Sequence, residues 1–142
     1  MYKYQYPVTL INNEEGGYVL TFRDVPEVIS EIWSMDELQK TGADALISGA
    51  DMYYETKTVF PEPSEPKENE VLIKLPFSAV AKILLHNAML SANIRPSDLA
   101  KKMGKMPQEV NRIIDLKHNT KIDTIQDAFR ALGKDLNVSV TD

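Results

Sequence analysis

The sequence predicts an α+β protein built from two modules of different character. In the first 75 residues, aromatic and β-branched residues alternate with polar ones, which is typical of half-buried strands. From Pro76 onward, apolar residues recur at three- and four-residue steps, between segments that begin and end with helix-capping residues. We therefore predict two domains, residues 1–75 and residues 76–142.

Length and composition limit the classes of protein that the chain can belong to. Its 142 residues are 43% hydrophobic and 26% charged, as in folded globular proteins. No apolar run approaches the roughly 18–20 residues of a membrane span, and the first residues do not resemble a signal peptide. The absence of cysteine excludes disulfides, thiolate metal sites and cysteine nucleophiles. We expect a cytoplasmic protein.

The N-terminal module is predicted to hold four strands and one helix. The alternation that begins at Tyr2 indicates a first strand over residues 2–10, and a glycine-containing turn then leads to a second. The predicted strands cover residues 2–10, 18–23, 28–33 and 71–75.

The predicted helix runs from Ser34 to about residue 55. Ser34 and Glu37 have the spacing of a capping box, in which each side chain bonds to the other residue's backbone N–H. Gly42 and Gly49 lie on the apolar face of this helix. We interpret them as sites of close approach to the sheet, although weak helix propensity is the simpler alternative.

The C-terminal module is predicted to be helical. Gly104 is placed to end one helix, Pro107 to open the next, and Thr120 with Asp123 to cap the last. The predicted helices cover residues 77–90, 95–103, 107–116 and 120–132.

The last residues alternate again and predict a terminal strand. Such a strand has no neighbour in a helical module, so we expect it to pair with its copy in a second chain. The residues predicted to form this dimer contact are Leu136, Val138 and Val140.

Residues 98–113 have the pattern of a helix-turn-helix. Ala100 is small where the two helices approach, Gly104 suits the tight turn, and Val110 with Ile113 would face the body of the module. The opposite face of the second helix carries the polar side chains that could reach bases, namely Gln108, Glu109, Asn111 and Arg112.

Basic residues gather around this motif. Residues 95–134 contain nine lysines and arginines against five aspartates and glutamates. The alternative is a solvated helical bundle that binds another protein. The residues predicted to contact the phosphate backbone are Lys105, Lys117, His118, Asn119 and Lys121.

The net charge of −5 hides a difference between the two modules. Residues 1–75 have 6 basic and 14 acidic residues, a balance of −8, whereas residues 76–142 have 10 and 7, a balance of +3. Such an asymmetry indicates two different partners.

The C-terminal motif resembles the Cro/repressor class of helix-turn-helix domains through Leu99-Ala-Lys-Lys-Met-Gly104, with Met106-Pro107 where that class carries a serine. The whole chain resembles the HicB antitoxin family, in the branch with a C-terminal helix-turn-helix. The matching segments are Tyr6-Pro-Val-Thr9, Glu15-Gly-Gly-Tyr18, Phe22-Arg-Asp-Val-Pro-Glu27, Ala43-Asp-Ala-Leu46 and Leu75-Pro-Phe-Ser78.

This resemblance implies a partial ribonuclease-H-like N-terminal fold that inhibits a HicA-type toxin, an mRNA-cleaving endoribonuclease. It also implies that the C-terminal domain represses the protein's own operon by binding operator DNA. Within the third matching segment we assign toxin contact to Asp24, Val25 and Pro26. The rival hypothesis is a helix-turn-helix regulator that senses a small ligand and has no toxin partner.

Catalysis is the less favoured hypothesis. A metal-dependent nuclease could use Asp51 and Glu55, which share one helix face, with Asp24 and Glu27. These carboxylates are not placed along strands as such an enzyme requires, and the two histidines are too far apart in sequence to indicate a zinc site. We expect no enzymatic activity, no catalytic residue, no metal site and no cofactor.

Overall fold

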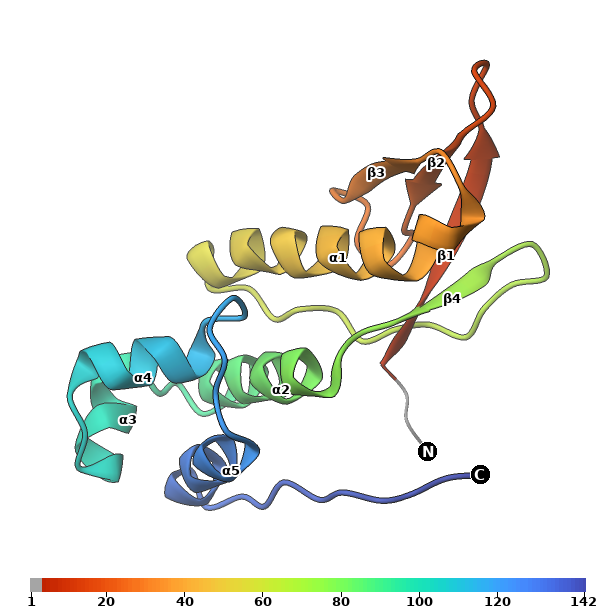
Figure 1. Cartoon of the computed structure of the whole chain (residues 1–142). Coiled ribbons are helices and arrows are strands. Elements are labelled where there is room, and N and C mark those ends of the chain that lie inside the picture. The colour runs from red at the N-terminus through yellow and green to blue at the C-terminus, as the bar shows by residue number, and fades with distance from the viewer. Residues whose placement is uncertain (1–3) are drawn as a thin grey trace. The chain divides into compact units, whose positions relative to one another are not determined.

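The computed structural model describes residues 4–142, so Tyr2 lies outside the described residues. The chain divides into two compact units. The sheet unit consists of Met1–Tyr53 and Pro61–Pro76, and the helical unit of Tyr54–Phe60 and Phe77–Asp142. The first unit holds the strands and one long helix, and the second holds the remaining helices (Figure 1), which confirms the predicted α+β class. No helix among the described residues is long and apolar enough to cross a membrane.

The sheet unit contains one antiparallel sheet with the strand order β3-β2-β1-β4. Thr9 pairs with Thr21 across β1 and β2, and Tyr6 pairs with Ile73 across β1 and β4. A short 3₁₀ turn, η1 (Met35–Glu37), leads into the helix of this unit. The elements are β1 (Gln5–Asn12), β2 (Tyr18–Thr21), β3 (Ile29–Ile32), α1 (Leu38–Glu55) and β4 (Val71–Lys74).

Helix α1 packs closely on the sheet unit at two glycines. A Cβ added to Gly42 would lie 2.9 Å from Ile73 Cδ1, and one added to Gly49 would lie 2.3 Å from Val28 Cγ2. These distances are too short for real side chains, so the interpretation of both glycines as sites of close approach is confirmed. The Ser34–Glu37 capping box is also present.

The outer edge of β4 is bonded to a side chain of α1. Gln39 Nε2 donates to the carbonyl of Leu72 at 2.8 Å, and Lys74 N donates to Gln39 Oε1 at 3.1 Å. These bonds satisfy backbone groups that an edge strand would otherwise present to solvent.

The helical unit contains four further helices around one apolar core. Gly104 ends α3 in the left-handed conformation with φ +66°, and Pro107 is the first residue of α4, as predicted. The cap of α5 differs from the prediction, because Lys121 is the N-cap and Thr120 bonds elsewhere. The helices are α2 (Phe77–Ser91), α3 (Pro96–Met103), α4 (Pro107–Ile114) and α5 (Ile122–Ala131).

The last nine residues leave α5 as an extended, strand-like segment (Figure 1). Leu136 packs partly against the core of the helical unit, whereas the side chains of Val138 and Val140 are 68% and 96% exposed. Pairing of this segment with a second chain stays a prediction.

Candidate functional site

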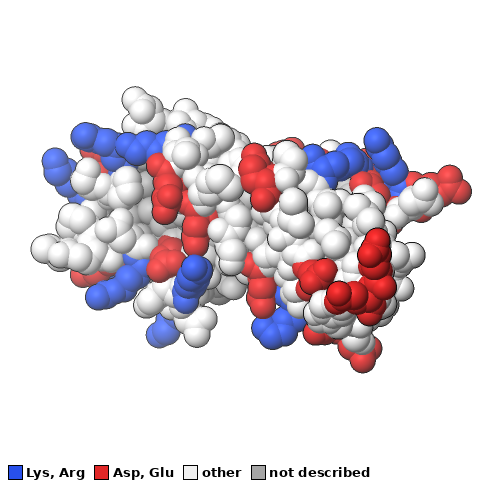
Figure 2. All heavy atoms as spheres, turned by 90° about the horizontal axis from the view of Figure 1, so that it is seen from above, with Lys and Arg blue, Asp and Glu red and all other residues white. Residues whose placement is uncertain are grey.

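The two units carry opposite net charges. The sheet unit contains 5 basic and 13 acidic residues, a balance of −8, and the helical unit 11 and 8, a balance of +3. On the face drawn in Figure 2, the densest group of acidic side chains lies at the right-hand end, while basic side chains are frequent at the left-hand end. The charge asymmetry of the sequence therefore follows the structural division.

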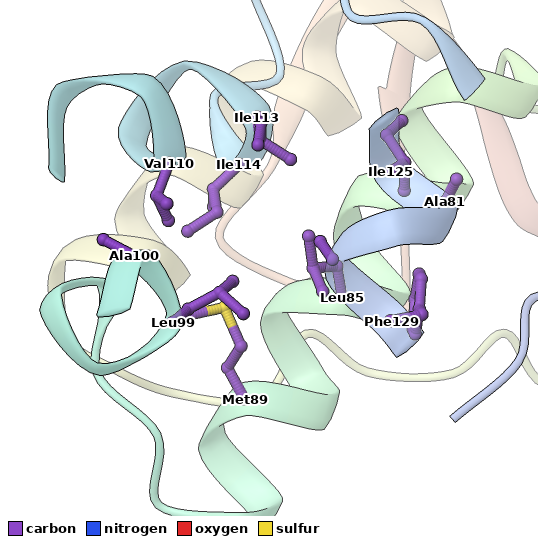
Figure 3. Close-up of a cluster of buried hydrophobic side chains, with 11 residues drawn as sticks. Ala81, Leu85, Met89, Leu99, Ala100, Val110, Ile113, Ile114, Ile125 and Phe129 are labelled. Atoms are coloured by element: carbon purple, nitrogen blue, oxygen red, sulfur yellow. The ribbon is translucent and has the colours of Figure 1, made fainter. Parts of the chain in front are cut away.

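Helices α3 and α4 are joined by a short turn and pack around buried apolar contacts. Leu99 and Val110 are fully buried, and Val110 and Ile114 point from α4 toward Leu99 of α3 (Figure 3). The turn between the helices is closed by Lys105 N, which donates to the carbonyl of Ala100 at 2.9 Å. This packing fixes which face of α4 remains outside the core.

The polar face of α4 lies at the surface. The side chains of Gln108, Glu109, Asn111 and Arg112 are all exposed. Lys105 Nζ lies 3.5 Å from Glu109 Oε2, an exposed ion pair of the kind that contributes little to stability. A helix with buried apolar residues on one side and amide and guanidinium groups on the other can offer donors and acceptors to base edges.

A short turn, defined here as the α4–α5 turn (residues 115–121), follows the polar helix. Asp115 organises it, because its Oδ1 accepts from Lys117 N at 2.9 Å and its carbonyl accepts from His118 N at 3.1 Å. The side chains of Lys117, His118, Asn119 and Lys121 are exposed. Since α5 begins directly afterwards, its N-terminal N–H groups lie beside these basic residues, an arrangement that suits an anion.

A lysine that was not among the predicted site residues is buried under this turn. Lys82 of α2 is 1% exposed, and its Nζ donates to the carbonyl oxygens of Arg112 (3.4 Å), Asp115 (2.6 Å) and His118 and to Thr120 Oγ1 (2.9 Å). Burial lowers the pKa of Lys82, an effect that the nearby charge of Asp115 opposes. A single charged residue in the apolar run of residues 79–85 was the signal available in the sequence.

His86 is the second buried polar residue of the helical unit. Its ring stacks on Tyr54 with centroids 4.0 Å apart, and its Nε2 lies 3.0 Å from the carbonyl oxygen of Thr58. Burial lowers the pKa of His86, while the Thr58 carbonyl acts in the opposite direction. These contacts tie the Tyr54–Phe60 segment to α2.

A cavity of about 600 Å³ lies beside this stacked pair within the helical unit. Met89 and Ile94 line its apolar side. Asn111 of α4 and Asp115, the residue that follows α4, line its polar side. The cavity therefore borders one of the side chains predicted to reach a base.

The segment assigned to toxin contact is partly buried, and its assignment stays a prediction. Val25 is fully buried, so its side chain cannot contact a partner while the sheet unit is folded. Pro26 is exposed, and the carboxylate of Asp24 accepts from Ser64 N at 2.8 Å and from Ser64 Oγ at 2.5 Å. Of the three assigned residues, the valine is the one whose side chain faces the interior of the sheet unit.

One of the carboxylates weighed for a nuclease is bonded to a tyrosine. Glu27 accepts a hydrogen bond from the Tyr53 hydroxyl at 2.8 Å, and burial together with this bond raises the pKa of Tyr53 to about 12. Among the described residues, no group of three or more histidine, cysteine, aspartate or glutamate side chains could hold a metal ion.

Comparison with known proteins decides the family. Residues 5–84 match the model of the HicB-like antitoxins of bacterial toxin–antitoxin systems. The chain belongs to the HicB-like antitoxin family. It is 40% identical over 134 residues to Antitoxin HicB of Escherichia coli (strain K12). The aligned residues make up 94% of this chain and 97% of the relative.

Two further relatives cover similar lengths. Antitoxin HicB 1 of Photorhabdus laumondii is 38% identical over 136 residues, 96% of this chain and 86% of its own. Antitoxin HicB of Pseudomonas fluorescens (strain Pf0-1) is 25% identical over 131 residues, 92% of this chain and 90% of its own. The HicB resemblance seen in the sequence is thus confirmed, and with it an antitoxin function in a toxin–antitoxin system.

Proposed function

We propose that this HicB-like antitoxin binds and inhibits a HicA-type toxin through the sheet unit, and represses its own operon through the helical unit as a homodimer. The observation that carries the proposal is the exposed polar face of α4 beside a basic turn, in a chain whose other unit is strongly acidic. Two units of opposite charge suit two partners of opposite charge.

Toxin binding rests on the acidic surface of the sheet unit. A ribonuclease must present a basic surface to RNA, and a unit with a balance of −8 would be attracted to that surface and compete for it. Within the unit, exposed Pro26 and Asp24, whose side chain is 9% exposed, remain the proposed contacts.

Operator binding places α4 in the major groove. Gln108 and Asn111 would contact base edges, and Arg112 would contact either a base or a phosphate. The residues proposed to contact phosphates are Lys105, Lys117, His118, Asn119 and Lys121.

Dimerisation would bring two recognition helices onto one operator. Val138 and Val140 expose apolar side chains on an extended segment, and such a segment can pair with its copy. Two helices that read half-sites about 34–36 Å apart discriminate far better than one helix that reads a few base pairs. Leu136, packed partly on the core, would set where the paired segment begins.

Operator binding is tested by replacing Gln108 and Asn111 together with alanine. We expect the double variant to lose operator binding, since each good base contact contributes about 1–3 kcal/mol of discrimination. It should still inhibit the toxin. The matched control replaces two exposed asparagines of the sheet unit, Asn12 and Asn69, with alanine. Unchanged operator affinity in the double variant would contradict the assignment of α4.

Toxin binding is tested by co-expression with the neighbouring reading frame. We expect its product to be a small basic protein that co-purifies with this chain, in a complex that weakens as salt is raised. Failure of the two folded proteins to associate would contradict the toxin assignment and leave the operator experiment unaffected.

A ligand-sensing regulator is the second candidate, favoured by the cavity of about 600 Å³ beside Asn111. A ligand there would lie against α4 and could alter its contact with DNA. This candidate predicts that a small molecule raises the melting temperature and releases operator DNA. A screen in which compounds do neither argues for the toxin-dependent function.

A further inference from the structure

The helical unit contains a charge whose burial is unfavourable for folding. Lys82 is 1% exposed, and the four acceptors of its Nζ are three carbonyl oxygens and a hydroxyl, so none of them carries a charge. Removing the lysine alone would leave these acceptors without their donor, which is unfavourable for buried polar groups. The ammonium group is therefore coupled to the conformation of the segment that supplies the acceptors.

The acceptors of Lys82 all lie between the last turn of α4 and the start of α5. The carbonyl of Arg112 belongs to the last turn of α4, where carbonyl groups lack helical partners and the helix dipole is negative. The carbonyls of Asp115 and His118 and the hydroxyl of Thr120 belong to the α4–α5 turn. A single ammonium group thus joins four points of one short segment.

Thr120 links the two ends of this segment directly. Its hydroxyl accepts from Lys82 Nζ at 2.9 Å and donates to the carbonyl of Arg112 at 3.3 Å. The backbone from residue 112 to residue 120 therefore closes around the ammonium group. Because an ammonium has three protons, the long bond to Arg112 is the weakest of the four.

We propose that Lys82 is the positioning residue of the phosphate-contacting turn, holding the backbone that presents Lys117, His118, Asn119 and Lys121 to DNA. The inference rests on the proposed operator binding. Lys82 is too deeply buried to touch a phosphate itself, so it acts through the turn. The turn's contacts go to the phosphate backbone and carry no sequence information, in contrast to the contacts of α4.

This role has a consequence that a merely structural lysine would not have. Loss of the turn should weaken binding to every DNA sequence by a similar factor, so the ratio between operator and unrelated DNA is kept. It should also lower the salt dependence of binding, since each lost phosphate contact reduces the slope of log K against log salt by about 1. Variants of Gln108 and Asn111 should instead lower the ratio between the affinity for operator DNA and the affinity for unrelated DNA.

The experiment compares the full-length protein with Lys82→Met and with the charge-matched control Lys40→Met, whose lysine side chain is 85% exposed in α1. The DNA probes are the fragment upstream of the protein's own gene and a scrambled fragment of equal length. We expect Lys82→Met to bind both about tenfold more weakly, with a salt slope lower by about 1–2. Amide hydrogen exchange should accelerate about tenfold or more in the α4–α5 turn and stay unchanged in α2.

The outcomes separate the two proposals. If the unaltered protein does not bind DNA, the proposed function fails, and hydrogen exchange still tests whether Lys82 orders the turn. If Lys82→Met binds like the unaltered protein, or binds weakly while exchange in the turn is unchanged, the inference is overturned.

A second variant covers the case in which Lys82→Met does not fold. Thr120→Val removes one acceptor of Lys82 and the bond to Arg112 without altering α2. We expect a smaller loss of the same kind, about threefold on both probes, with faster exchange in the turn. Full DNA affinity and unchanged exchange in Thr120→Val would then overturn the inference.

Discussion

The two units bury different kinds of residue. Among the described residues, the buried polar or charged side chains are Lys82 and His86, and both belong to the helical unit. The sheet unit instead depends on shape, because α1 approaches Val28 and Ile73 at glycines that leave no room for a methyl group. The sheet unit should therefore be sensitive to added volume, and the helical unit to changes in charge.

The largest expected effect tests whether the units act separately. Leu99→Ala empties a fully buried position in the core of the helical unit and should lower the free energy of unfolding by about 2–5 kcal/mol. DNA binding should be lost at growth temperature, while the toxin remains inhibited. Thermal melting, gel-shift assays and a toxin assay in the same preparation measure the three effects.

Leu46→Ala is the matched control, because Leu46 is equally buried but belongs to the sheet unit. It should reduce toxin inhibition and spare DNA binding. If either variant abolishes both activities, the two units do not function separately and the comparison fails.

Added volume in the sheet unit has the next largest effect. In Gly49→Ala the new methyl group would lie 2.3 Å from Cγ2 of Val28, a β-branched side chain with little rotamer freedom. Overpacking of this kind costs about 1–3 kcal/mol, against a gain in helix propensity of about 1 kcal/mol. We expect net destabilisation in urea unfolding and weaker toxin inhibition.

Two neighbouring substitutions show whether the volume is responsible. Ser48→Ala changes an exposed residue of the same helix and should leave stability nearly unchanged. Gly42→Ala meets the flexible end of Ile73 at 2.9 Å and should cost less than Gly49→Ala. Stabilisation of Gly49→Ala by the full helix-propensity gain of about 1 kcal/mol would show that Val28 moves aside without cost.

A glycine of the helical unit gives a smaller effect for a different reason. Gly104 has φ +66°, but a Cβ added there meets nothing within 4 Å. Gly104→Ala should therefore cost about 1 kcal/mol through backbone conformation alone. Gly104→Asn should lose less stability than Gly104→Ala, since asparagine tolerates this conformation better than alanine does. Equal melting temperatures for both variants would contradict this explanation.

The sequence predicted the local structure well because local patterns determine it. Alternation placed the strands, and the capping box, Gly104 and Pro107 placed helix ends to within a few residues. The helix predicted to reach residue 116 ends at Ile114. These signals work over a few residues, where the chemistry of neighbouring side chains and backbone decides the outcome.

The errors arose where a distant contact overrides a local preference. Thr120 was a reasonable N-cap, but Lys82, 38 residues earlier, recruits its hydroxyl. Val25 lies in a turn-forming segment beside Pro26, yet its side chain is fully buried. Pairing of the terminal segment depends on a second chain and stays a prediction.

The smallest expected effect is a pH dependence that should be confined to the helical unit. Burial holds the pKa of His86 below its usual 6.5, so the folded state favours the neutral ring more than the unfolded state does. The resulting stability is complete above pH 6.5 and is lost as the pH falls from there through the folded-state pKa. His86→Phe keeps a ring stacked on Tyr54 but has no proton to gain. The melting temperature should therefore fall further between about pH 7 and about pH 5 for the unaltered protein than for the variant. A difference between the two proteins that does not change with pH would show that protonation of His86 has no part in the stability of this unit.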